Sequence, residues 1–360
     1  MKEQKTNGRV RYLDAAKGLG LYLVMFGHIS TIGNNAIDTW SRTFKLAIFF
    51  IISGWLIAYK GNFENVQVVP FIKKKARGLM IPYFWFSIIA ILYQAFFLRM
   101  KCILMPKYKK LVWDTIYQAI SCRGISALWF LPALFIGEVL FVLLLRKKGW
   151  MRKLIVAVIS IAIALLLSRS FPVLKGRLSE DAYMYVSYPL LAISKGITGF
   201  FFMILGYGGY KALCLVKNSN IRLAIGVAAT ILNIIMLQNI RGTVDFNNMK
   251  FGAVPMLWFA CATLGSFGAI LVLEYFERFF SYPLLGWGGN NSLIIMATHT
   301  TLGFRTLLVK GWTAMAGMPN YIGLHFYVES FVIFFELLLI EYAIVELVNK
   351  KAKFLTGSSK

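Results

Sequence analysis

Long runs of apolar residues alternate along the chain with short clusters of basic residues. A helix that spans a membrane needs about 20 mostly apolar residues, and about ten runs come near that length. They cover approximately residues 12–31, 43–60, 79–99, 125–146, 151–169, 188–210, 221–240, 251–275, 285–309 and 322–348. The pattern predicts an all-α fold, a polytopic integral membrane bundle of about ten transmembrane helices.

The composition supports a membrane protein and excludes the soluble classes. Hydrophobic residues make up 58% of the 360 positions and charged residues 15%, against about 25% charged residues in a typical soluble domain. A soluble, fibrous or disordered chain of this size could not cover that much apolar surface. We expect residues 1–348 to form a single transmembrane domain and residues 349–360 to form a short, basic cytoplasmic tail.

The basic residues predict the orientation of the bundle. The net charge is +24, but Lys and Arg mostly lie in short clusters between apolar runs, which is typical of topology signals beside phospholipid rather than of nucleic-acid binding. An inside N-terminus makes the connections 60–78, 147–150, 211–220 and 276–284 cytoplasmic, and the strongest clusters fall on that side. We therefore expect a multi-pass protein of the inner or plasma membrane with both termini cytoplasmic, surrounded by lipids and without a nucleic-acid partner.

One connection disagrees with this orientation. The segment 100–124 would lie outside, yet it carries Lys101, Lys107, Lys109, Lys110 and Arg123. It is either an external basic surface for an anionic substrate or a sign that the count of spans is wrong by one near Trp113. The first interpretation is favoured, because shifting the count reverses the clusters that follow.

The first apolar run holds three ionisable residues, Asp14, Lys17 and His28. Such groups are costly inside a membrane and are functional candidates by default. Lys17 and His28 are eleven residues apart, which places them near one helix face and about 16 Å apart along the axis. Asp14 and Lys17 are i,i+3 neighbours that can form an ion pair. The alternatives are interfacial anchoring for the charged pair and a structural hydrogen bond for the histidine.

Five segments together resemble a known family. They are RYLDAAKGLGLYLVMFGH at 11–28, FFIISGWL at 49–56, KKKARGLMIPYFWF at 73–86, LWFLPALF at 128–135 and GNNSLIIMATH at 289–299. In order and spacing they resemble the membrane-bound acyltransferase-3 family, which includes O-acetyltransferases that modify bacterial surface polysaccharides. The compact sugar O-acetylases without an additional esterase-like domain are the nearest type, and the resemblance extends over nearly the whole chain.

The resemblance implies a donor site for acetyl-CoA. Lys17 and His28 meet the family's pattern of a basic residue, a ten-residue gap and a histidine. Lys74 and Arg77 meet its basic-x-x-Arg pattern, and Ser53 with Gly54 meets its Ser-Gly pair. Lys17, Lys74, Arg77, Ser53 and Gly54 are thus expected to bind the donor.

The resemblance also implies an acceptor site. Trp129, with Phe130 and Pro132, meets the family's Trp-Phe-x-Pro piece, and Asn291 and His299 fall in its Asn-Ser-to-His piece. These residues are expected to contact the acceptor, although an aromatic belt for Trp129 and a structural hydrogen bond for His299 are alternatives. Many sugar acetylases have a His-x-Pro piece where this chain has Lys45 and Ala47, so the acceptor specificity stays open.

Elementary chemistry agrees with these roles. An alcohol is a poor nucleophile, so acyl transfer to it requires a base, and a neutral imidazole suits that task near physiological pH. We expect His28 to be the base and Asp14 to support catalysis by holding Lys17. The basic cluster 73–77 suits the phosphates of acetyl-CoA, although a plain topology signal is an equally weighted and compatible interpretation.

Several other residues receive no role from the sequence. Glu138, Glu329 and Glu336 lie within apolar runs, and Arg305 is a candidate partner for one of the last two. Cys102, Cys122, Cys214 and Cys261 have neither CxxC spacing nor a neighbouring histidine, so no metal site is expected.

The sequence therefore predicts an integral-membrane O-acyltransferase. It would move an acetyl group from cytoplasmic acetyl-CoA to a hydroxyl of a cell-envelope glycan or of its lipid-linked precursor. The alternatives are a transporter or flippase for an anionic or lipid-linked solute, which fits the composition equally well, and a binding or sensor protein with a degenerate site. The joint presence of Lys17, His28, Lys74 and Arg77 favours the enzyme.

Overall fold

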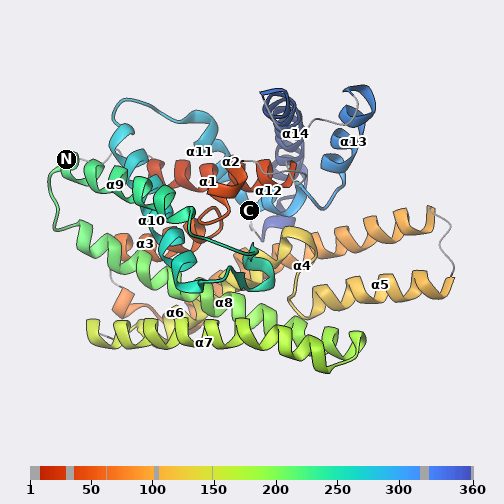
Figure 1. Cartoon of the computed structure of the whole chain (residues 1–360), viewed down its shortest axis with the longest axis horizontal. Helices are drawn as coiled ribbons and strands as arrows, with labels where there is room; N and C mark the ends of the chain where they lie inside the picture. Colours follow the sequence, from red (N-terminus) through yellow and green to blue (C-terminus); the bar gives the residue numbers. More distant parts are fainter. Residues whose placement is uncertain are drawn as a thin grey trace.

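The computed structural model describes residues 9–29, 36–61, 63–100, 105–147, 149–316 and 324–357. These ranges are almost entirely helical (Figure 1). The longer helices are α1 (Arg11–Ile29), α3 (Ala47–Lys60), α4 (Val68–Met100), α5 (Met105–Ile120), α6 (Phe130–Leu145), α7 (Trp150–Arg177), α8 (Glu180–Leu213), α9 (Ser219–Leu237), α10 (Pro255–Phe276) and α14 (Leu324–Lys351).

Shorter elements connect the long helices. They are α2 (Ala36–Ser41), α11 (Pro283–Asn290), α12 (Ser292–Thr298), α13 (Phe304–Ala316) and the 3-10 turns η1 (Phe63–Asn65), η2 (Ser126–Trp129), η3 (Phe246–Asn248) and η4 (Lys353–Thr356). An antiparallel hairpin of β1 (Val244–Asp245) and β2 (Lys250–Phe251) encloses η3, with Val244 opposite Phe251.

The predicted all-α, polytopic class is confirmed, whereas the count of ten spans is not. Six of the described helices are long and apolar enough to cross a membrane: α4, η2 with α6, α7, α8, α9 and α10. Neither α1, which carries Asp14 and Lys17, nor α14, which carries four glutamates, is among them. In α1 these charges lie near the start of the helix, whereas in α14 the glutamates are spread along its length and include Glu336 and Glu341 in its middle.

The prediction of one helix over 285–309 is wrong. The chain forms α11, breaks at Asn291, forms α12 and turns again before α13. Three glycines weaken α11 as a helix. One of them, Gly289, allows α11 to lie so close to α1 that a Cβ there would overlap the carbonyl oxygen of Asp14. The segment 285–309 therefore forms short helices, the first of which packs closely against α1, instead of one continuous membrane span.

The segment 100–124 is mostly helical, rather than the loop that was expected. α5 runs back beside the second half of α4, and the two form a hairpin that projects to one side (Figure 1). Lys110 on α5 forms an exposed ion pair with Asp181 at 2.8 Å. Lys101 lies outside the described residues.

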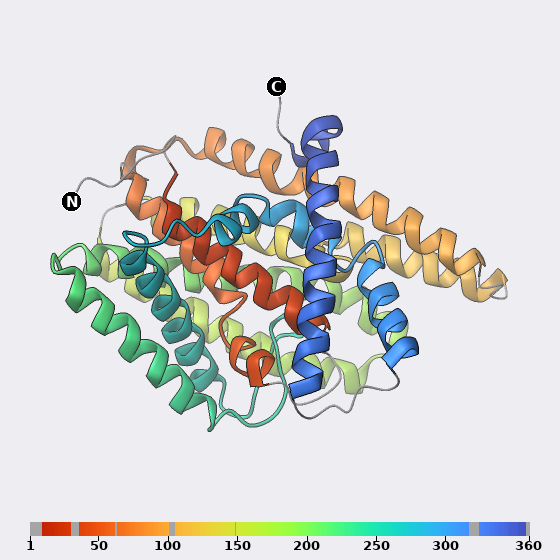
Figure 2. The same ribbon diagram turned by 90° about the horizontal axis from the view of Figure 1, so that it is seen from above.

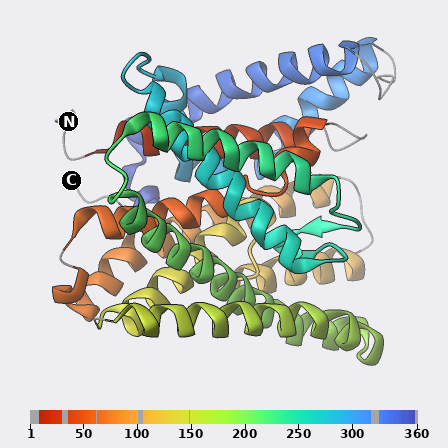
Figure 3. The ribbon, with the colours of Figure 1, turned by 60° about the vertical axis from the view of Figure 1, so that its left-hand side comes forward.

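Close helix packing surrounds the middle of the molecule. α1 lies between α3, α10, α11 and α14 (Figure 2). α3 packs on α8 through small residues, because a Cβ at Gly54 would overlap the carbonyl of Met203 and one at Gly206 the carbonyl of Ile51. α7 lies outside α8, and α9 pairs with α10 (Figure 3).

The bundle has two chemically different ends. The end that we call the basic end holds the start of α1, the end of α3, the first turns of α4 and the end of α14. Asn349 donates to Asn291 there at 3.2 Å, and Arg11 pairs with Glu277 at 3.7 Å. The opposite end, which we call the cavity end, holds the end of α1, α2, η2 and the β-hairpin. The start of α1 and the end of α14 therefore lie at one end of the molecule.

Candidate functional site

A cavity of about 470 Å³ lies at the cavity end. Its walls come from α1, α2, the turn between α2 and α3, η2, α6, the β-hairpin with η3, α10 and α12. Its ionisable and amide lining consists of His28, Asp38, Arg42, Lys45, Asp245 and Asn247. In the residues for which coordinates are described, no three His, Cys, Asp or Glu side chains are grouped so that they could hold a metal ion.

His28 lies on the last turn of α1, half-buried in the cavity wall. Its ring centroid is 5.4 Å from that of His299, with the two planes inclined by 47°. The sequence pattern had placed these imidazoles 271 positions apart on different runs, and the fold brings them into contact. His28 therefore combines access to the cavity with a second imidazole behind it.

The hydrogen bond of His299 fixes its neutral tautomer. Its Nδ1 lies 2.7 Å from the carbonyl oxygen of Ile295, and a carbonyl can only accept, so Nδ1 carries the proton. Nε2 then keeps its lone pair, and this buried atom has no hydrogen-bond partner among the described residues. His299 is 1% exposed and can act only through groups that touch it.

An ion-pair cluster lies next to His28. Lys45 Nζ donates to Asp38 Oδ1 at 2.6 Å, and Arg42 donates to the other oxygen. A Cβ at Gly27 would overlap both Lys45 Nζ and Asp38 Oδ1, so the missing side chain makes the space that the pair occupies. Burial alone would raise the pKa of Asp38, but Lys45 and Arg42 outweigh it and hold that pKa below its usual value.

Trp129 forms another part of the wall, close to a buried cation. It is 5% exposed, and Lys195 Nζ lies 4.8 Å from its ring centroid. Gly124, at a φ of +80°, lets the chain turn tightly here, because a Cβ would overlap the backbone of Trp129. Trp129 thus lines the same cavity as His28, as its predicted acceptor role requires.

Sequence reasoning missed five charged residues around this cavity, among them Asp245 on β1. Asp38 and Arg42 lie in a polar connection where charged residues are common, so nothing in the sequence indicated a functional role for them. Lys45 was noted only as a departure from the family's pattern. Lys195, fully buried in the middle of α8, carried a usable signal, because a lone lysine inside an apolar run is a functional candidate.

The cations of the predicted donor site lie together at the basic end. Lys17 pairs with Asp14 at 3.0 Å, as the i,i+3 spacing predicted. Lys60 interacts electrostatically with Lys75, Lys74 and Lys17, so lysines from α1, α3 and α4 share one region.

Within this basic region, Lys75 and Lys74 have different surroundings. Lys75 Nζ lies 2.5 Å from Oε1 of Glu138, a carboxylate that is 3% exposed. This contact gives Glu138, to which the sequence assigned no role, a structural partner. Lys74 is exposed and remains accessible to an anionic ligand.

Arg77 is exposed on α4 and is held by the segment after α14. Its Nε donates to the carbonyl oxygen of Gly357 at 3.1 Å. The ring of Phe354 in η4 packs edge-on against Trp85 of α4 at 5.3 Å. Residues 349–357 therefore continue α14 and then pack on α4 beside the predicted donor residues.

The remaining predicted site residues lie elsewhere. Gly54 is at the α3–α8 contact, and Ser53 beside it is half-buried. Asn291 donates to the carbonyl of Trp287 at 2.9 Å and accepts from Asn349. The structure thus places Asn291 at the basic end, and it does not bring this residue to the cavity that Trp129 lines or to His299 behind its wall.

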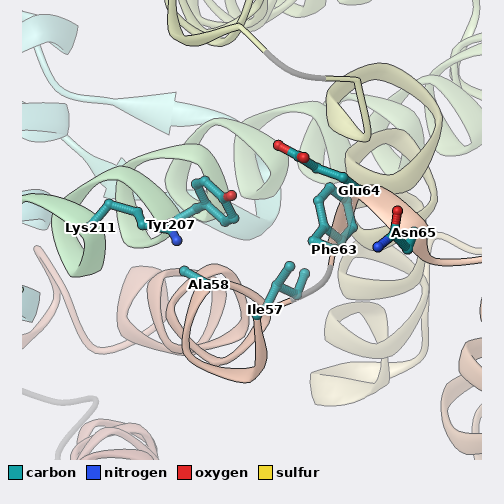
Figure 4. Close-up of a pocket in the computed structure, with 8 residues that line it drawn as sticks. Ile57, Ala58, Phe63, Glu64, Asn65, Tyr207 and Lys211 are labelled. Carbon is teal, nitrogen blue, oxygen red and sulfur yellow. The ribbon is translucent and has the colours of Figure 1, made fainter.

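A smaller cavity of about 210 Å³ lies between the end of α3, η1 and α8. Figure 4 shows Tyr207 and Lys211 of α8 near Ile57 and Ala58 of α3, with Glu64 on η1. None of the sequence-predicted site residues lines it. The candidate chemistry therefore belongs to the larger cavity and to the basic end.

Comparison with known proteins bears on both regions. The acyltransferase-3 family model, described as an acyltransferase domain, matches residues 10–340. Neither curated proteins nor solved structures give a match. The matched range contains every sequence-predicted site residue and ends before η4.

Proposed function

The chain belongs to the acyltransferase-3 family of membrane acyltransferases, and from that premise we propose that it acetylates a glycan. The donor would be acetyl-CoA, and the acceptor a hydroxyl of a cell-envelope glycan or of its lipid-linked precursor. One observation carries the proposal. α1 bears Lys17 among the lysines of the basic end and His28 in the wall of the cavity.

The dimensions of α1 suit a two-sided reaction. Lys17 and His28 are about 16 Å apart along the helix axis, comparable with the reach of a pantetheine arm. A donor whose phosphates bind at the basic end can extend its thioester along α1 toward His28. In this proposal the basic end faces the cytoplasm, both termini are cytoplasmic, and the cavity end faces the opposite side of the inner or plasma membrane.

The donor residues act mainly through charge. Lys74 and Arg77 present exposed cations to the phosphates, and such charge-assisted contacts are the strong class of hydrogen bond. Asp14 holds Lys17 by its ion pair. Ser53 is the further donor contact proposed on α3, and Gly54 contributes by letting α3 and α8 approach closely.

His28 is the proposed general base. Its imidazole accepts the proton of the acceptor hydroxyl as that oxygen attacks the thioester carbonyl carbon. The carbon–sulfur bond then breaks, the acetyl group remains on the acceptor as an ester, and the departing thiolate recovers the proton from His28. Trp129 offers a ring face on which a sugar can stack, and His299 supports His28 from behind.

Radiolabelled acetyl-CoA supplied to proteoliposomes that contain the protein and envelope glycan tests the proposal. We expect release of free CoA together with an alkali-labile acetyl ester on the glycan, and neither product with His28→Ala. Movement of a lipid-linked glycan across the bilayer without CoA release would support the transporter interpretation and contradict the enzyme.

A further inference from the structure

The carboxylates that line the cavity already have partners within the chain. Both oxygens of Asp38 accept from cations, one from Lys45 and one from Arg42. The oxygens of Asp245 accept from the backbone N–H of Asn248 at 3.2 Å and from its side-chain amide at 2.6 Å. Asp38 is thus used by Lys45 and Arg42, whereas Asp245 keeps its charge and acts electrostatically on Lys195 and Arg123 without forming an ion pair with either.

Cations near the cavity outnumber these carboxylates. Arg42 lines the cavity with 48% of its side chain exposed, so much of its guanidinium remains available. Lys195 and Arg123 lie behind Asn247, and neither has a carboxylate at ion-pair distance in the described part of the chain. Arg305 adds a further positive charge that acts on His28 and His299.

Asn247 connects two cations, the buried Lys195 and the half-buried Arg123, to the cavity. Its Oδ1 accepts from Lys195 Nζ at 3.2 Å and from Arg123 Nη1. Because both partners are donors, the amide orientation is fixed and Nδ2 points away from them as a donor. Within the described ranges no acceptor contacts Nδ2, and Asn247 is part of the cavity wall.

Positive charge without a counter-ion is costly in a medium of low dielectric. A bound anion removes that cost, and the planar guanidinium of Arg42 fits the paired oxygens of a carboxylate or a phosphate. We propose that the acceptor carries such an oxyanion, which Arg42 and Nδ2 of Asn247 bind beside His28. This inference rests on the proposed acetyl transfer and specifies the class of acceptor: an acidic glycan.

The first test asks which glycan receives the acetyl group. Envelope glycans from cells with and without the gene are separated by anion exchange, and ester-linked acetate is measured in each fraction. We expect the new ester only in the retained, acidic fraction. Phosphatase treatment removes retention that is due to phosphate, and carbodiimide-driven reduction of carboxyl groups removes retention that is due to acidic sugars, so the two sources of the oxyanion are distinguished.

The outcomes separate this inference from the proposed function. New acetyl ester confined to unretained, neutral glycan would overturn the acidic acceptor and leave the acetyltransferase intact. The absence of new ester from all fractions, with no release of CoA by the purified protein, would overturn the proposed function itself.

The second test uses variants with the acidic glycan fraction as the probe. Arg42→Gln should raise the KM for this fraction about ten- to hundredfold, with the KM for acetyl-CoA unchanged, and Arg42→Lys should restore part of the loss. Arg241→Gln is the matched control, because it removes an exposed guanidinium that does not line the cavity. An unchanged KM in Arg42→Gln, or an equal rise in Arg241→Gln, would overturn the proposal.

A third variant remains informative if Arg42→Gln does not fold. Asn247→Asp places a carboxylate between Lys195 and Arg123 and so supplies the missing counter-ion from within the chain. We expect a higher melting temperature in detergent together with weaker use of the acidic glycan. A stabilised variant that uses this glycan as well as the parent would contradict the inference.

Discussion

Gly27 and His28 are adjacent on the last turn of α1, and each shapes the cavity in a different way. His28 contributes an imidazole to the wall, whereas Gly27 contributes the space in which the Lys45–Asp38 pair lies. The sequence indicated His28, because an imidazole in an apolar run is exceptional. It could not indicate the role of Gly27, because that role depends on residues of another segment that fold against α1.

Replacement of His28 by alanine should lower acetyl transfer about 10²- to 10⁴-fold, the usual contribution of a general base. Protein yield and acetyl-CoA binding should change little, since the side chain is half-buried in a cavity wall rather than in the packed interior. Turnover per folded molecule is the measurement. A variant purified in normal yield that keeps more than about a tenth of the parent rate would show that His28 is not the base.

Gly27→Ala tests the space at the end of α1. Alanine is the better helix former by about 1 kcal/mol, but the new methyl group would displace a buried ion pair, and overpacking costs about 1–3 kcal/mol. We therefore expect a lower melting temperature in detergent. Gly208→Ala is the matched control, because a Cβ at that helical position meets nothing within 4 Å. Equal melting temperatures for the two variants would contradict this account.

At the scale of elements, helices are predictable from the sequence where burial alone explains them. The apolar runs located α6, α7, α8, α9 and α10 to within a few residues at most ends. The prediction of one spanning helix over 285–309 was wrong, because this run is apolar through its burial against α1 and does not form a straight transmembrane helix. The connection 100–124 contains α5 because an amphipathic helix can lie beside α4 without a long apolar run.

The first turns of α4 should determine the affinity for the donor. Lys74→Ala with Arg77→Ala removes two exposed cations, and each lost charge-assisted contact costs about 1.5–3 kcal/mol. The KM for acetyl-CoA should rise while the KM for the acceptor stays the same. If the double variant is expressed normally and its affinity for acetyl-CoA is unchanged, the basic cluster 73–77 serves only as a topology signal.

The contact of η4 with α4 should influence the same affinity from a distance. Gly357 has a φ of +67°, and a Cβ there would overlap the carbonyl oxygen of Arg77. Gly357→Ala should therefore release Arg77 and raise the KM for acetyl-CoA. Gly61→Ala is the control, since Gly61 has a φ of +66° but open space around its Cβ position. A donor KM that rises equally in both variants would assign the effect to backbone strain.

At the scale of the whole molecule, the proposed function assigns donor binding and acyl transfer to opposite ends of α1. The all-α class and the location of the start of α1 and the end of α14 at one end agree with the sequence, because apolar runs and basic clusters can be recognised without a three-dimensional structure. The cavity did not follow, because its charged lining comes from short connections whose association is set by the packing of α1, α10 and α12. Lys195 shows most clearly what the sequence cannot predict. Its surroundings depend on Asn247 and Trp129, which belong to other elements.

The two ends of the bundle should face opposite sides of the membrane. Cys214 is free and exposed beyond α8 at the basic end, and Lys250 is exposed on β2 at the cavity end. In a background with Cys102→Ser and Cys122→Ser, an impermeant maleimide should label Lys250→Cys in intact cells. The same reagent should label Cys214 only after permeabilisation. Labelling of Cys214 in intact cells would invert the proposed orientation.

The bond between Arg77 and Gly357 joins two segments that are synthesised at very different times. Its two residues are 280 positions apart, so α4 is inserted into the membrane long before the ribosome synthesises the segment that holds Arg77. Until then the guanidinium lacks this anchor, even where the surrounding helices are already in place. If these residues bind the donor as proposed, the donor surface is a late product of biogenesis, and a nascent chain that stalls after α13 would carry His28 without a finished donor site.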